Sequence, residues 1–71
     1  MKKVGKVFGS EAQAKPLVII GDNVYIHTDI KQLDENLYEY VEYQCTTSEF
    51  LMAVFSTKSA EELLNLLGVE I

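Results

Sequence analysis

Cysteine and histidine each occur once among the 71 residues of the chain, as Cys45 and His27. A single cysteine excludes an intrachain disulfide framework, so nothing in the sequence requires an oxidising compartment. One histidine and one cysteine are too few ligands for a zinc site, and Asp29, Asp34 and Glu35 lack the spacing of a calcium-binding loop. We therefore expect neither a metal ion nor a cofactor.

Long apolar runs are also missing, and no stretch reaches the length that spans a bilayer. The basic start is typical of a signal peptide, but Gly5, Lys6 and the residues from Gly9 to Glu11 interrupt the hydrophobic segment that would have to follow it. We expect a soluble, unprocessed protein with no membrane partner and with the cytosol as its default location.

Basic residues are scarce beyond the first fifteen positions. Four lysines and one glutamate give residues 1–15 a net charge of +3, which leaves −8 for residues 16–71 and −5 for the whole chain. An acidic body repels phosphate, which argues against nucleic acid as a partner. We interpret the basic arm as an edge strand whose lysines discourage edge-to-edge aggregation, with a mobile arm as the alternative.

Apolar residues are abundant, at 48% of the chain. This content predicts a folded state, and the length predicts one domain, residues 1–71, near the lower limit for an independent core. So short a chain cannot cover all of its apolar surface. We therefore expect self-association or a partner protein.

A β-hairpin is the clearest local pattern and covers Leu17–Ile30, with its turn at Gly21–Asn23. The first strand, Leu17–Ile20, is apolar on both sides, so we expect it to be the more central one. In the second strand, alternation predicts a core face and a more polar face with Tyr25, His27 and Asp29. The predicted core face carries Val24, Ile26, Thr28 and Ile30.

Two further strands are predicted, at Lys3–Phe8 with a bulge at Gly5 and at Leu37–Cys45. We expect Gly9–Lys15 to be a mobile connection and Lys31–Asn36 to be a polar one. In the Leu37–Cys45 strand, the residues expected against the core are Leu37, Val41 and Tyr43, with Glu39 near the rim.

Helical periodicity begins after Cys45. A capping box at Thr46–Glu49 predicts a helix over Thr47–Phe55, and a second box at Ser59–Glu62 starts Ala60–Leu67, which Gly68 should end in a left-handed conformation. The stripe expected to face the core in the first helix comprises Phe50, Leu51, Val54 and Phe55. The predicted fold is therefore α+β, an antiparallel sheet of three to four strands with two short C-terminal helices on one face.

Catalytic equipment is sparse. His27 and Cys45 are the only pair that suggests nucleophilic catalysis, and Cys45 also occupies the position of a hydrophobic staple before the first helix. A packed thiol explains that position without any chemistry. We therefore expect a protein that is not an enzyme.

Two groups of residues are candidates for partner binding. Tyr25, Tyr38 and Tyr40 could anchor a protein interface on one sheet face, although ordinary cross-strand packing also explains them. The C-terminal run exceeds what one small sheet can cover and could dock on a copy of itself or on another protein. Its members are Leu63, Leu64, Leu66, Leu67, Val69 and Ile71.

The strings VIIGDNVYIHTDI, LYEYVEYQ and TTSEF, within Val18–Phe50, resemble those of small uncharacterised proteins encoded by Firmicutes phages and prophages, often among tail and lysis genes. His27 stands where those proteins commonly have arginine, and Val41 where they commonly have an acid. The resemblance contains no catalytic motif, so it implies a phage context and no mechanism.

These observations together predict a non-enzymatic phage or prophage protein that acts by protein contact. The expected role is a small structural or assembly component of the virion, with itself or phage structural proteins as partners. It would reside in the cytoplasm of the host bacterium or in the virion. The alternative is a small acidic effector that binds and inhibits a host protein.

Overall fold

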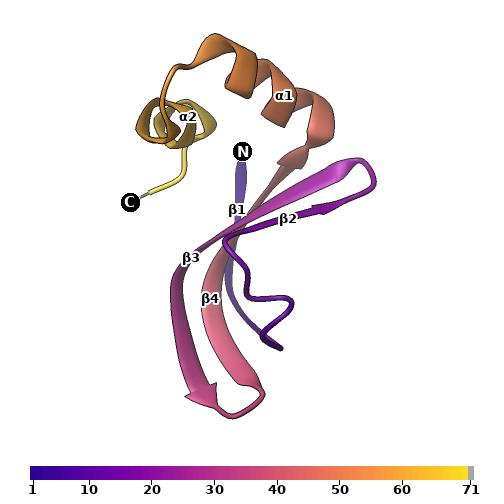
Figure 1. Cartoon of the computed structure of the whole chain (residues 1–71), viewed down its shortest axis with the longest axis vertical. Coiled ribbons are helices and arrows are strands. Elements are labelled where there is room, and N and C mark those ends of the chain that lie inside the picture. Colours follow the sequence, from indigo (N-terminus) through magenta and orange to yellow (C-terminus); the bar gives the residue numbers. More distant parts are fainter. Residues whose placement is uncertain (71) are drawn as a thin grey trace.

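The computed structural model describes residues 1–70. The elements, in chain order, are β1 (Lys2–Gly9), β2 (Leu17–Ile20), β3 (Asn23–Asp34), β4 (Leu37–Thr46), α1 (Thr47–Ser56) and α2 (Ala60–Leu67). The strands form one antiparallel sheet in the order β1-β4-β3-β2, and the helices lie together at one end of it (Figure 1). The predicted α+β class is confirmed.

The β2–β3 hairpin has the predicted tight turn. Ile20 pairs with Asn23, which leaves Gly21 and Asp22 as a two-residue loop, and Gly21 has the positive φ, 57°, that such a turn requires. The predicted central place of β2 is wrong, because β2 is an edge strand. The long strand β4 pairs with the other side of β3 instead, so both faces of β2 remain largely exposed.

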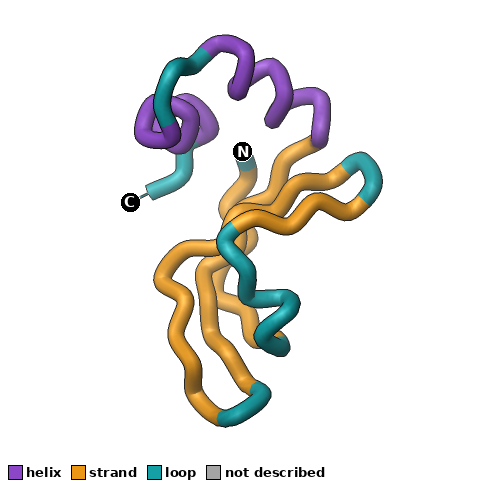
Figure 2. Tube along the Cα trace, viewed as in Figure 1, coloured by secondary structure: helices purple, strands orange, loops and turns teal. Residues whose placement is uncertain are grey.

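The β3–β4 hairpin is longer than predicted. The segment expected as a polar connection belongs to β3 as far as Asp34, and only Glu35 and Asn36 turn the chain (Figure 2). A register shift follows Thr28, where Asp29 has a φ of 51°. Beyond this bulge the hairpin extends away from the helices, so Ile30 and Leu37, both expected in the core, are exposed.

The core lies between one face of the sheet and the two helices. Val24 pairs with Cys45 and Ile26 with Tyr43, which places these four side chains on the covered face. Three residues from the C-terminal part of the chain complete the buried cluster: Ala53, Leu67 and Val69. Packed against it are Met1, Val41, Phe50, Leu63 and Leu64.

Helix α1 presents a different face to the core than the sequence predicted. Ala53 is its only buried residue within the described chain, Phe50 is half-buried, and Leu51, Val54 and Phe55 are exposed. The small alanine side chain lets the helix approach the sheet and α2 closely, and the larger side chains beside it are turned outward.

Both helices begin at the predicted caps. The hydroxyl oxygens of Thr46 and Ser59 accept hydrogen bonds from the amides of Glu49 and Glu62, at 3.1 and 3.2 Å. A capping box also predicts that the glutamate carboxylate accepts a hydrogen bond from the amide of the cap residue. Here the Glu49 carboxylate accepts from the Thr46 hydroxyl instead, and the Glu62 carboxylate accepts from the Lys58 amide. Gly68 ends α2 with a φ of 80°, as predicted.

The basic N-terminal segment is an edge strand. A register shift between Lys3 and Gly5, with a φ of 122° at Gly5, confirms the predicted bulge. The segment after β1, expected as a mobile connection, contains a hydrogen-bonded turn. In this turn the Ser10 carbonyl accepts hydrogen bonds from the Gln13 and Ala14 amides. Ala14 is buried, which anchors this segment on the sheet.

Candidate interaction surfaces

The three tyrosines predicted to bind a partner share one sheet face, as expected, but they differ in exposure. Tyr25 and Tyr38 are half-buried, whereas Tyr40 is 4% exposed and its ring lies 4.3 Å from the His27 ring. The end of β1 covers this position, because a Cβ on Gly9, the last residue of that strand, would lie 2.6 Å from the Tyr40 hydroxyl oxygen. Tyr40 therefore packs within the chain and exposes little side chain for the predicted contact with a partner.

The predicted contact residues near the C-terminus also differ in their exposure. Leu67 and Val69 belong to the buried core, so they too expose little side chain for the predicted contact with a partner. Leu63 and Leu64 are half-buried against that core, and Leu66 is 59% exposed. The sixth residue of this group, Ile71, lies outside the described residues.

His27 is buried rather than exposed on the tyrosine face. Its Nδ1 lies 2.6 Å from the Lys15 carbonyl oxygen and its Nε2 lies 3.1 Å from Oε1 of Glu42. Both neighbours are acceptors, so both bonds form when both ring nitrogens carry protons. The imidazole thus fastens the segment entering β2 to the middle of the sheet.

Cys45 and His27 do not form a catalytic pair. The register places Cys45 opposite Val24 and His27 opposite Glu42, so the thiol and the imidazole lie on opposite faces of the sheet. Burial raises the pKa of the Cys45 thiol, and the Glu49 carboxylate raises it further. The geometry agrees with the interpretation of Cys45 as a packed thiol.

The hollow beside His27 and the hollow at the end of α2 both contain polar side chains, but neither brings a free acid and a free base together. A cleft of about 280 Å³ is bordered by Tyr25, His27 and Glu42, of which His27 and Glu42 already bond each other. Burial raises the pKa of Tyr40 beside it, with a contribution from the Glu42 charge. This cleft therefore offers no unpaired acid or base.

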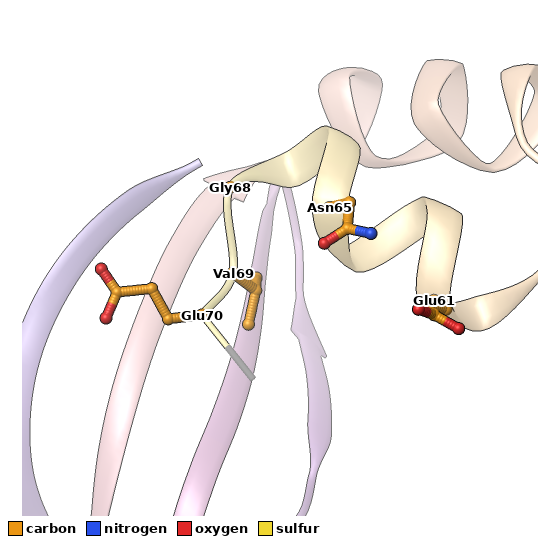
Figure 3. Close-up of a pocket in the computed structure, with 5 residues that line it drawn as sticks. All are labelled: Glu61, Asn65, Gly68, Val69 and Glu70. Carbon is orange, nitrogen blue, oxygen red and sulfur yellow. The ribbon is translucent and has the colours of Figure 1, made fainter.

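The second hollow lies at the C-terminal end of α2 and measures about 530 Å³. Figure 3 shows Glu61 and Glu70 on opposite sides of it, with the Glu70 carboxylate directed away from Glu61. Glu70 pairs instead with Lys3, at 3.5 Å. Across residues 1–70, no group of three histidine, cysteine or acidic side chains could hold a metal ion.

Many of the exposed apolar residues form two surfaces, of which the sequence prediction named only Leu66 as a contact residue. The first, called here the helical patch, includes Met52 at 71% and Phe55 at 85% exposure. Met52 and Leu66 border a common hollow, which joins the two helices in one surface. The members of the helical patch are Leu51, Met52, Val54, Phe55 and Leu66.

The second surface is the β2 edge, defined by Leu17, Ile19 and Ile20, which are 47%, 55% and 63% exposed. One sequence signal could have placed this strand at the edge, since Pro16 at its entry is typical of edge strands. The helical patch had a weaker signal. The small Ala53 between large apolar neighbours could have indicated which side of α1 packs closely against the core.

No helix within residues 1–70 has both the length and the apolar character needed to cross a membrane. No protein-family model matches the chain, and comparisons with curated proteins and with solved structures give no match. The arguments about function therefore depend on the surfaces described above.

Proposed function

We propose that this protein acts by protein contact and without catalysis, as a small structural or assembly component of a phage particle. The observation that carries the proposal is the helical patch, in which Phe55 is 85% and Met52 71% exposed. Large apolar side chains gathered on a small protein are typical of a surface that another protein covers.

The charges around the patch define the chemistry of its partner. The two helices and their caps carry Glu49, Glu61 and Glu62 and a single cation, Lys58. A complementary surface would present an apolar groove or helix with basic residues at its rim. The phage context of the partner comes from the resemblance of the sequence between Val18 and Phe50.

Particle composition tests this proposal. Particles released from a strain that carries the gene are purified, and the protein is quantified in them by mass spectrometry. We expect the wild-type protein in the particles, and we expect Phe55→Asp to be lost from them because a charge at the centre of the patch cannot be desolvated. Leu33→Asp, at an exposed apolar position on the distant hairpin, is the matched control.

Absence of the wild-type protein from purified particles, with normal amounts in the cell, would overturn the structural role. It would favour instead the small acidic effector that binds a host protein. Equal incorporation of Phe55→Asp and wild-type protein would exclude the helical patch as the contact.

A further inference from the structure

The β2 edge has backbone groups that face away from the sheet. Ile20 and Asn23 close a two-residue hairpin, so they are a hydrogen-bonded pair, and such pairs alternate along an antiparallel ladder. The hydrogen bond from the His27 amide to the Pro16 carbonyl, 3.0 Å, fits this alternation. The amides and carbonyls of Leu17 and Ile19, between these pairs, therefore point outward.

The side chains of this edge carry no charge. Leu17 and Ile19 lie on the same face as Val24 and Ile26, and Leu17 also lines an apolar groove of about 230 Å³. That groove continues to Phe50, Leu63 and Leu64 beneath the helices. The unpaired backbone and the apolar surface thus occur together along one short strand.

We propose that β2 pairs in antiparallel fashion with β2 of a second copy of this chain. With Leu17 opposite Ile19 of the second copy, a two-fold axis passes between the two Val18 residues, and each of the four outward amides meets an outward carbonyl. This inference rests on the proposed contact function, because it names a second copy as one of the partners.

A second copy fits this edge better than an unrelated strand does. The strand consists of Leu17–Ile20 alone, so each copy presents the other with the same apolar side chains and no like charges meet, although each chain has a net charge of −5. The interface is also small compared with the roughly 800 Å² per partner of a standard one. The dimer should therefore be weak, with a Kd between about 10 μM and 1 mM.

Sedimentation equilibrium between about 10 μM and 1 mM tests the pairing, a range that brackets the expected Kd. We expect the wild-type mass to rise from that of a monomer toward twice that value. Ile19→Lys should remain a monomer throughout, because a lysine on the edge opposes strand addition. Phe8→Lys, which replaces a similarly exposed residue on the β1 edge, should dimerise like the wild type.

Amide hydrogen exchange of the wild-type chain provides a second measurement that needs no folded variant. The Leu17 and Ile19 amides should exchange more slowly at high than at low protein concentration. The Val18 amide, which faces β3, should be protected at both. A monomeric wild type at 1 mM, unchanged dimerisation of Ile19→Lys, or exchange at Leu17 and Ile19 that is independent of concentration would each overturn the pairing.

Failure of this inference and failure of the proposed function give different results. A monomeric protein that enters particles through Phe55 would refute only the β2 pairing. A dimer that requires Ile19 but is absent from particles would refute only the structural role.

Discussion

The two edges of the sheet are built in opposite ways. Strand β1 is eight residues long, carries Lys2, Lys3 and Lys6, and is bent by the bulge at Gly5. Strand β2 has four residues, Leu17–Ile20, none of them charged. Lysines and bulges on an edge oppose pairing with other strands. The comparison shows that β1 is protected against strand addition and that β2 is open to it.

The open edge is also held in place. The His27 amide donates to the Pro16 carbonyl, and the His27 ring contacts the Lys15 carbonyl on the same segment. Strand β2 is therefore fixed at its entry by a buried residue and at its exit by the turn at Gly21. An edge fixed in this way loses little conformational freedom when a second strand pairs with it.

The largest effect on stability should come from proline at a position of β2 whose amide faces β3. Val18→Pro removes an amide that faces β3, so we expect a loss of about 3 kcal/mol or more in the free energy of unfolding. Ile19→Pro removes an outward amide and should cost much less. Urea unfolding at low protein concentration measures both, and equal losses would show that the outward direction of Ile19 is wrong.

His27→Leu should have the next largest effect. The substitution removes both ring nitrogens and leaves the Lys15 carbonyl and the Glu42 carboxylate without this partner. We expect a loss of about 1–3 kcal/mol in unfolding free energy, the range for a buried hydrogen bond left unmade. Gln32→Leu is the control and should change stability little, because it removes only exposed hydrogen bonds, to the Asp34 and Glu35 carbonyls. If both variants unfold alike, His27 does not anchor β2.

The sequence predicted local structure well because local signals specify it. Thr46, Ser59 and Gly68 mark the helix ends through hydrogen bonds and backbone conformations within a few residues of each. The place of β2 in the sheet depends instead on which strand lies beyond β3, and no pattern within Leu17–Ile20 contains that information.

The exposed apolar surface was predicted only in part for the same reason. Apolar residues surround much of α1, so the sequence of this helix does not by itself determine which of its sides packs against the core. Packing of Ala53 against the sheet and α2 decides between them, and this turns Phe55 outward. The burial of Tyr40 was not predicted because the end of β1 covers this side chain, and that contact joins residues far apart in the sequence.

Gly5→Ala should test the bulge that protects β1. No atom lies within 4 Å of the position of the added Cβ, so the cost comes only from the φ of 122°, which residues with side chains rarely adopt. We expect a loss of about 1–3 kcal/mol, at the lower end because alanine is small. Val4→Ala, at the exposed neighbouring position, is the control. Equal stability of Gly5→Ala and wild type would mean that β1 tolerates a regular strand here.

Lys6→Ala should have the smallest effect on stability. Lys6 lies 2.8 Å from Glu39 but is largely exposed, and exposed ion pairs contribute little. Their hydrogen bond lowers the pKa of Glu39, so the contribution of the pair is present at neutral pH and is lost as Glu39 becomes protonated in acid. Thermal unfolding should therefore show a slight difference from wild type at pH 7 and none in acid. Because Lys2, Lys3 and the bulge remain, sedimentation should still show a dimer and no larger species. Species larger than a dimer would mean that Lys6 alone prevents strand addition at the β1 edge.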